Sequence, residues 1–364
     1  MNLIKPNSFV GNLIPYIPGK PVEELEREIG IRDAVKIASN ENPLGPSPLA
    51  VEAVKEAVSS LNRYPDGDAF YLKEKLSSKL GISPETLIFG NGSNDVIDIA
   101  ARTFMKPGDE AIFGEYAFIV YPIVTQAVGA KAVISPMPDY THDLRDMYSR
   151  ITEKTKIIFI ANPNNPTGTM VKRGEFEWFL DKVPEDILVL MDEAYFEYVD
   201  DQDYPNSLEY QNTDKSILTV RTFSKIYGLA GLRLGYGIAS KEIISNMQRI
   251  RQPFNSNSLS QVGAIAALDD KEHIEKTKEV NSEGLTYVTQ ELKKLDIPYA
   301  PSYTNFVLID IGDDPMPVYN SLLREGVIVR PVMGYGLKTH LRVTIGVSEE
   351  NDKFISGIKK VLGK

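Results

Sequence analysis

The segment RTFSKIYGLAGLRLGY places Lys225 among hydroxyl-bearing residues and glycines, directly after a buried apolar run. A solvated surface lysine needs no such setting, because its flexible ammonium makes no demand on its neighbours. A nucleophilic lysine does, since its amine must lose a proton and approach a carbonyl carbon in a fixed geometry. Lys225 is therefore the first candidate for covalent chemistry.

Further polar groups follow other apolar runs. Asn165 stands in PNNPTG after KIIFIAN, and Asp192 and Tyr195 stand in DEAY after ILVLM. The turn GNGSND precedes a helical pattern that starts at Asn94, and a helix N-terminus presents free amide donors to an anion. If the apolar runs are parallel strands, these groups project from neighbouring strand ends toward one crevice.

Each of these features alone has an ordinary structural explanation as a turn, a helix cap or a loop carboxylate. Their joint placement at one sheet edge favours a functional explanation. Pyridoxal phosphate is a cofactor that needs such a set: a carboxylate for its ring nitrogen, donors for its phenolate oxygen and a lysine for its aldehyde. Its phosphate needs hydroxyls, amides and an arginine. We therefore hypothesise a pyridoxal phosphate site.

The apolar runs that position these groups alternate with helical patterns. We expect strands at residues 110–115, 130–135, 156–162, 187–193, 216–222 and 233–239, and helices near 94–105, 118–129 and 174–183. This alternation predicts an α/β fold with a mostly parallel sheet between helices.

The character of the sequence changes after Pro253. A long helical region near 259–295 leads to shorter apolar runs and a terminal helix, which predicts a smaller α+β domain. We divide the chain into an N-terminal arm with part of the small domain (1–45), a large domain (46–255) and a small C-terminal domain (256–364).

Composition excludes several classes of protein. The formal net charge of -10 argues against binding to nucleic acid or to an anionic membrane surface. The 364 residues include no cysteine, which excludes disulfides and thiolate catalysis. The three histidines, His142, His273 and His340, fit no cluster, so we expect no metal site. The first residues lack a continuous apolar segment, so we expect neither a secretion signal nor a membrane anchor, and a cytoplasmic location.

An ordered series of motifs along nearly the whole chain resembles the fold-type I aminotransferases, which depend on pyridoxal phosphate, and within them the histidinol-phosphate aminotransferase family. The motifs are YIPGKP, ASNENPLGPSP, LNRYPDG, GNGSND, NPNNPTG, DEAY, TFSKIYGLAGLRLGY, TNFVL and HLRVTIG. One departure is GSND, where many relatives carry an acidic residue directly after the serine. Backbone donors do not depend on that side chain.

The resemblance implies roles at the cofactor. Lys225 would be the Schiff-base lysine, Asp192 the partner of the pyridine nitrogen, and Tyr195 and Asn165 the partners of the phenolate oxygen. Phe118, in YAFIVY, would stack on the ring, although it also suits a hydrophobic core.

The resemblance also implies a phosphate site and a dimer. The phosphate would be held by Thr222, Ser224, Arg233 and the backbone around Ser93 and Asn94. Tyr64, in LNRYPDG, would reach the phosphate of the neighbouring subunit's cofactor, which implies a homodimer.

On the substrate side, the resemblance implies that Arg342 clamps an α-carboxylate, because its planar fork suits bidentate contact. Arg330 would meet the phosphate of the substrate, and Tyr16 and Asn305 would make further substrate contacts. The implied reaction converts L-histidinol phosphate and 2-oxoglutarate to imidazole acetol phosphate and L-glutamate.

Other functions remain open on the sequence alone. An aromatic or broad-specificity aminotransferase is the nearest alternative, and a decarboxylase acting on an amino-acid phosphate is more distant. The same scaffold also occurs as a sensor domain of transcription regulators. No basic helix-turn-helix segment precedes the scaffold in this sequence, and Lys225, which a non-catalytic binding protein would be expected to lose, is present.

Overall fold

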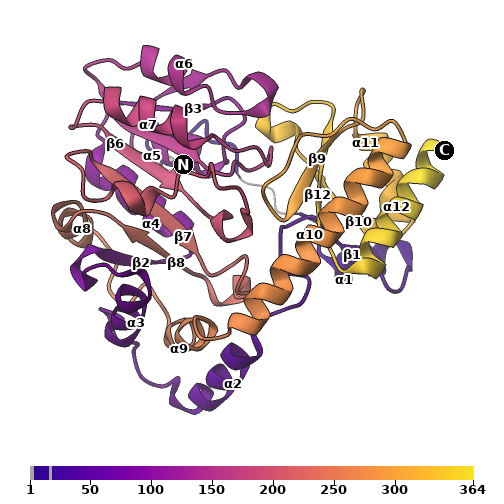
Figure 1. Ribbon diagram of the computed structural model, residues 1–364, viewed down its shortest axis with the longest axis horizontal. Coiled ribbons are helices and arrows are strands. Elements are labelled where there is room, and N and C mark those ends of the chain that lie inside the picture. The colour runs from indigo at the N-terminus through magenta and orange to yellow at the C-terminus, as the bar shows by residue number, and fades with distance from the viewer. Residues whose placement is uncertain (1–3, 16–18) are drawn as a thin grey trace.

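A seven-stranded sheet forms the centre of the larger part of the chain in the computed structural model, which describes residues 4–15 and 19–364 (Figure 1). Its strand order is β2-β8-β7-β6-β5-β3-β4. Strand β8 is antiparallel to β2 and β7, and the other neighbouring pairs are parallel. The predicted α/β fold with a mostly parallel sheet is confirmed. The strands are β2 (Leu87–Asn91), β3 (Glu110–Gly114), β4 (Lys131–Ser135), β5 (Thr155–Ala161), β6 (Leu188–Asp192), β7 (Ile217–Thr222) and β8 (Leu234–Ile238).

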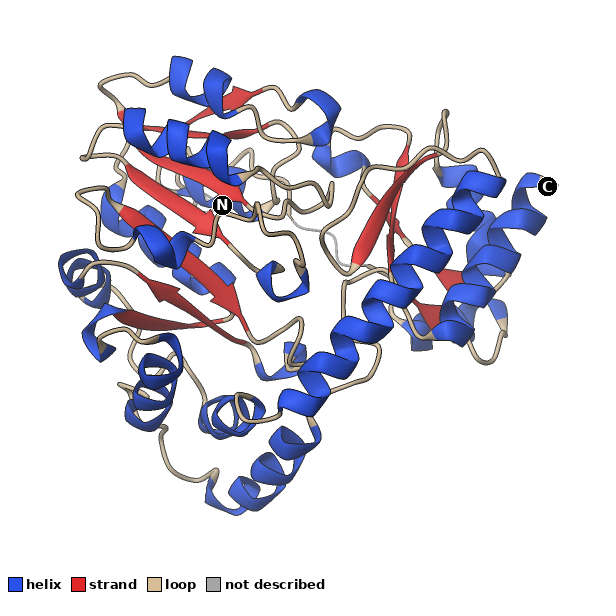
Figure 2. Ribbon diagram, viewed as in Figure 1, coloured by secondary structure: helices blue, strands red, loops and turns tan. Residues whose placement is uncertain are grey.

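Helices cover both faces of this sheet (Figure 2). Along β5, Ile157 and Phe159 pack into one hydrophobic cluster and Ile158 and Ile160 into another, because successive side chains point to opposite faces. This two-sided burial explains why the central strands β5 and β6 are almost continuously apolar in the sequence. The helices of this part are α2 (Pro48–Ala57), α3 (Phe70–Leu80), α4 (Ser93–Phe104), α5 (Val120–Ala127), α6 (Leu144–Ser149), α7 (Arg173–Lys182), α8 (Lys241–Gln248) and α9 (Ser258–Ala267).

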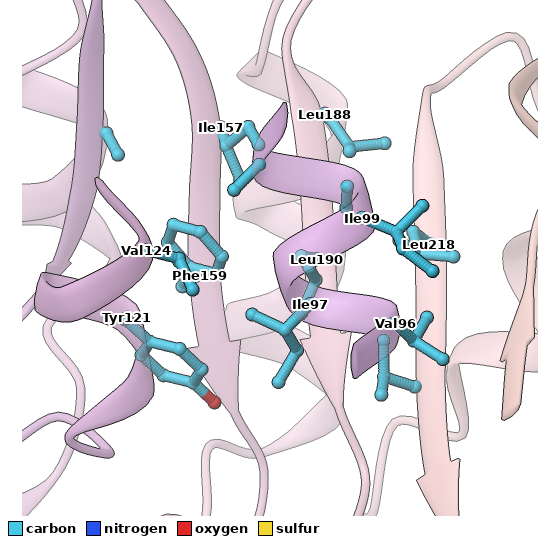
Figure 3. Packing of buried hydrophobic residues seen from close by; sticks show 14 of the residues in the cluster. Val96, Ile97, Ile99, Tyr121, Val124, Ile157, Phe159, Leu188, Leu190 and Leu218 are labelled. Carbon is cyan, nitrogen blue, oxygen red and sulfur yellow. The ribbon is translucent and has the colours of Figure 1, made fainter. Parts of the chain in front are cut away.

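Helix α4 is held against the centre of the sheet (Figure 3). Its buried Ile97 and Ile99 share a cluster with Phe159 of β5, Leu190 of β6 and Leu218 of β7. This packing fixes the N-terminus of α4 near the carboxyl ends of these three strands.

A second, smaller unit contains a three-stranded antiparallel sheet in the order β11-β12-β9. Its elements are α10 (Lys271–Lys294), β9 (Phe306–Asp310), α11 (Met316–Arg324), β10 (Val327–Ile328), β11 (Arg330–Pro331), β12 (His340–Thr344) and α12 (Ser348–Leu362). A separate hydrophobic cluster includes Leu292, Val307 and Phe354 from α10, β9 and α12. Figure 1 shows α10 running from beside α9 to α11 and α12.

The N-terminal segment packs with this smaller unit. Helix α1 (Val22–Ile29) buries Leu25 against Leu323 and Ile328, and β1 (Val35–Lys36) pairs with β10. We propose on this basis that the arm contributes to the small domain.

The predicted helical region near 259–295 is divided into α9 and α10, because Asp270 caps α10 by accepting a hydrogen bond from the backbone amide of His273. Ala264 of α9 packs in the cluster of Ala50 and Leu72. We therefore propose a domain boundary between α9 and α10 instead of after residue 255.

Among the described residues, no helix is both long and apolar enough to cross a membrane.

Candidate active site

A cavity of about 430 Å³ lies at the carboxyl ends of β5, β6 and β7, and residues of β11 and β12 border it from the small sheet. The predicted site residues that line it are Ser93, Asn94, Phe118, Asn165, Asp192, Tyr195, Thr222, Ser224, Lys225, Arg233, Arg330 and Arg342. Strand ends far apart in the sequence thus bring these groups together, as expected for an open parallel sheet.

Lys225 follows β7, and its Nζ lies 3.4 Å from the backbone oxygen of Ser39. Burial, together with the positive charge of Arg342, lowers the pKa of Lys225 to about 7. A lysine with such a pKa is partly neutral near pH 7, so its amine can act as a nucleophile or accept a proton.

Asp192 ends β6 and is only 5% exposed. Its Oδ2 accepts a hydrogen bond of 2.8 Å from the Tyr121 hydroxyl, and its Oδ1 accepts one from the Ala194 amide. Burial nevertheless raises the pKa of Asp192 to about 6, because a buried carboxylate is costly without a cation. A protonated ring nitrogen placed beside Asp192 would stabilise its charged form.

The N-terminus of α4 offers an anion site next to Arg233. The residue before the helix, Gly92, has φ of 80° and no side-chain cap, so the first amides of α4 are not capped by a side chain. A Cβ on Gly92 would lie 2.6 Å from Nη2 of Arg233, and one on Gly235 would lie 2.2 Å from the Ser93 nitrogen. Only glycine at both positions allows β8, Arg233 and the helix N-terminus to approach this closely.

Tyr195 and Asn165 face the cavity from the ends of β6 and β5. The Tyr195 oxygen accepts a 2.9 Å hydrogen bond from the side-chain amide of Asn40, and burial raises the pKa of Tyr195 to about 12. Asn165 Oδ1 accepts a 2.5 Å hydrogen bond from Arg342. Because of its raised pKa, the Tyr195 hydroxyl stays protonated at neutral pH and can donate a hydrogen bond.

Arg330 and Arg342 occupy paired positions on β11 and β12, and both line the cavity. Arg342 also donates to the Ala38 carbonyl over 2.8 Å, and its guanidinium lies 5.1 Å from the centre of the Phe306 ring. Two guanidinium groups on one side of a cavity are suited to binding a substrate with two anionic groups.

Two predicted residues that the structure describes, Tyr64 and Asn305, do not line the cavity. Tyr64 is 83% exposed and stacks on Phe254. Asn305 is buried behind the cavity wall, where it donates to the Asn40 carbonyl over 3.1 Å. Tyr16 lies outside the described residues.

Sequence reasoning assigned no role to several residues that line or support the cavity. Ser39, Asn40 and Glu41 border it, although they belong to the motif ASNENPLG. Tyr121 supports Asp192, and its spacing of three residues from Phe118 in YAFIVY was the available signal. Tyr335 ends the short 3-10 helix Met333–Tyr335, a segment whose sequence carried no signal.

Comparison with known proteins gives a consistent result. The family model described as Aminotransferase class I and II matches residues 32–358. A protein of Moorella thermoacetica named histidinol-phosphate aminotransferase is 47% identical over 349 residues, covering 96% of this chain and 90% of the relative. A protein of Nitrosococcus oceani named histidinol-phosphate aminotransferase 1 is 48% identical, covering 97% of this chain and 95% of the relative.

Solved structures agree with the fold. The histidinol-phosphate aminotransferase of Sinorhizobium meliloti, in complex with pyridoxal-5'-phosphate, matches with a TM-score of 0.90 and 25% identity, covering 99% of this chain and 98% of that chain. An aspartate aminotransferase of Thermus thermophilus with maleate matches with a TM-score of 0.83 at 22% identity, which supports the fold alone.

Proposed function

The chain belongs to the class I and II aminotransferase family, and we propose that it exchanges an amino group between L-histidinol phosphate and 2-oxoglutarate. It is an enzyme that transfers amino groups with pyridoxal 5'-phosphate. The observation that carries the choice of substrate is Arg330, a second guanidinium beside Arg342 that borders the same cavity as Lys225 and can bind a distal phosphate. The naming of relatives that are 47% and 48% identical supports the same substrate.

The residues present fit pyridoxal phosphate. The uncapped N-terminus of α4 and the Arg233 guanidinium suit its phosphate, with the Thr222 and Ser224 hydroxyls nearby in the cavity wall. Asp192 is a buried carboxylate whose pKa is raised by burial, so a cation placed beside it would stabilise its charged form. The glycines at 92 and 235 let Arg233 and β8 approach the N-terminus of α4, which brings the proposed phosphate contacts together.

We assign each remaining role to a group of this chain. When bound, the cofactor supplies an electron sink that lets an amino group pass from one substrate to the next. Lys225 holds the cofactor aldehyde and moves a proton at the substrate carbon that bears nitrogen, for which a pKa of about 7 is suited. Asp192 keeps the ring nitrogen protonated, and Tyr195 and Asn165 hold the ring oxygen. Phe118 lines the cavity and would pack on the ring.

In this proposal, Arg342 and Arg330 bind different anionic groups of the substrates. Arg342 holds the α-carboxylate of glutamate, and Arg330 holds the distal anion, which is a phosphate in histidinol phosphate and a carboxylate in glutamate. Histidinol phosphate carries a hydroxymethyl group in place of the α-carboxylate, so it depends less on Arg342.

We also propose that the active form is a homodimer. Large apolar side chains are exposed along residues 49–71, among them Leu49, Leu61, Tyr64 and Tyr71. Exposed apolar surface of this kind favours an interface, and a second copy of the chain would cover it. Tyr64 would then reach the partner's cavity. The cytoplasmic location expected from the sequence stays a prediction.

Single-turnover half-reactions with histidinol phosphate, glutamate and phenylalanine test the proposal. Arg330→Ala should lower the specificity constant for histidinol phosphate roughly 30-fold to 1000-fold, because a charge-assisted contact to phosphate is lost. Arg342→Ala should lower the specificity constant for glutamate far more than that for histidinol phosphate. Phenylalanine brings no distal anion, so it should respond little to Arg330→Ala.

Specificity constants of the parent enzyme distinguish the proposed function from that of an aromatic or broad-specificity aminotransferase. We expect its specificity constant for histidinol phosphate to exceed those for phenylalanine and tyrosine in one preparation. Equal constants, with Arg330→Ala slowing phenylalanine as much as histidinol phosphate, would favour an aromatic or broad-specificity aminotransferase.

A further inference from the structure

Asn40 borders the cavity between β12 and Tyr195, and it is only 1% exposed. Its backbone amide donates to the Thr344 hydroxyl over 2.9 Å, and its backbone oxygen accepts from Asn305. Its side-chain oxygen lies 3.0 Å from the Thr344 hydroxyl, and its side-chain nitrogen lies 2.9 Å from the Tyr195 oxygen. Asn40 therefore connects the small sheet directly to Tyr195.

The donors and acceptors fix the direction of these bonds. The Thr344 oxygen accepts a hydrogen bond from the backbone amide of Asn40, and the Thr344 hydroxyl donates a hydrogen bond to the side-chain oxygen of Asn40. The amide nitrogen of Asn40 then faces Tyr195 and donates to the phenol oxygen. An amide nitrogen cannot accept a hydrogen bond, so the proton of the Tyr195 hydroxyl must point elsewhere.

We propose that Asn40 and Thr344 are positioning residues that make the Tyr195 oxygen an acceptor and thereby direct its hydroxyl proton to the cofactor oxygen in the cavity. This inference rests on the cofactor role proposed for Tyr195, and it is independent of which substrate the enzyme prefers.

The same strand supports both groups that would hold the cofactor oxygen. Thr344 and Arg342 are two residues apart on β12, so their side chains leave the strand on the same face. Thr344 acts on Tyr195 through Asn40, and Arg342 donates to Asn165. Strand β12 of the small domain therefore sets the hydrogen bonds that the large domain offers to the cofactor.

The pH titration of the visible absorbance of cofactor-loaded enzyme, recorded without substrate, tests this role. A hydrogen-bond donor at the cofactor oxygen stabilises its anionic form, so loss of the donor moves the titration midpoint to higher pH. Thr344→Val replaces the hydroxyl by a methyl group, and Asn40→Gly removes the amide while suiting the positive φ of 56° at this position. Each should raise the midpoint by roughly 0.4 to 1 pH unit.

Two variants serve as controls. Thr344→Ser keeps the hydroxyl and should titrate like the parent. Thr277→Val removes another buried hydroxyl, which accepts a hydrogen bond from Asn42, so it reports the general effect of such a loss near this segment. It should leave the midpoint unchanged.

The variant Tyr195→Phe distinguishes an error in the cofactor role of Tyr195 from an error in the positioning role of Asn40 and Thr344. In this background Thr344→Val should cause no additional change, because no hydroxyl proton remains to be directed. If Tyr195→Phe alone leaves the midpoint unchanged, the cofactor role of Tyr195 is wrong and the inference falls with it. If Tyr195→Phe raises the midpoint but Thr344→Val and Asn40→Gly do not, the inference alone is overturned. A change by Thr344→Val that persists without the Tyr195 hydroxyl also overturns it.

Discussion

Burial changes the acid–base properties of Lys225 and Asp192 in opposite directions. It lowers the pKa of the lysine to about 7 and raises that of the carboxyl to about 6, because both charged forms lose contact with water. Each residue is thereby prepared for a partner: a carbonyl carbon for the amine and a cationic ring nitrogen for the carboxylate.

Asp192→Asn should still bind the cofactor but lose roughly 100-fold or more in rate, because a neutral amide cannot stabilise the charge on the ring nitrogen. The substitution does not alter the α4 amides or Arg233, so the anion site should remain intact. Half-reaction rates, together with cofactor content measured by absorbance, check this. Rates equal to those of the parent at full cofactor content would show that the carboxylate has another role.

His142 should make stability depend on pH. Burial lowers its pKa to about 4 from 6.5, so the unfolded chain binds a proton more readily than the folded chain between these values. The stabilising contribution of the neutral ring is present above pH 6.5 and is lost as the pH falls toward 4. The difference of about 2.5 in pKa corresponds to about 3 kcal/mol.

The raised pKa of the buried Asp192 has the opposite effect, because it makes the free energy of unfolding rise as the pH falls. The parent must therefore be compared with a variant that lacks only the imidazole. The free energy of unfolding in urea at pH 7.5 and pH 5 should fall more steeply for the parent than for His142→Gln. Equal pH dependence of the two proteins would contradict the assignment to His142.

At the scale of elements, the anion site depends on the close approach of α4 to β8. Gly235→Ala would place a Cβ 2.2 Å from the Ser93 nitrogen, and backbone cannot move aside as a flexible side chain does. We expect a loss of about 1 to 3 kcal/mol in stability and weaker cofactor binding.

Gly174→Ala is the matched control, because a Cβ at this position in α7 meets nothing within 4 Å. Thermal unfolding without cofactor and cofactor titration of both variants check the prediction. Parental cofactor affinity in Gly235→Ala would rule out the proposed phosphate site.

The elements that sequence patterns predicted well are those with a strong hydrophobic period. Strands β3 to β8 lie within one or two residues of the expected ranges, because runs of mostly apolar residues alternating with helical patterns mark the strands of a sheet covered by helices. Strand β2 was not predicted, since LIFGN is short and ends in residues that favour turns. The cavity residues at strand ends could be anticipated from topology. The role of Asn40 could not, because it arises from a contact with Thr344, which is distant in sequence. For Tyr121 the spacing from Phe118 was the only signal, and its contact with Asp192 became visible only in the fold.

At the scale of the whole molecule, the two units and a proposed second subunit meet around one cavity. Tyr64 is exposed in the single chain, so its proposed role needs a partner. Tyr64→Ala and Lys225→Ala proteins should each have low activity. Mixed heterodimers contain one cavity with both defects and one with neither, so activity should partly recover. Verified heterodimers without recovery would place the action of Tyr64 within its own subunit.

The central claim is that Lys225 carries the cofactor covalently, and borohydride reduction of the cofactor-loaded protein tests it most directly. Reduction traps the bond between a lysine and the cofactor aldehyde, and peptide mapping by mass spectrometry then locates it. We predict label on Lys225 in the parent, together with loss of label and turnover in Lys225→Ala. Label on another lysine, or turnover that survives in Lys225→Ala, would contradict the account.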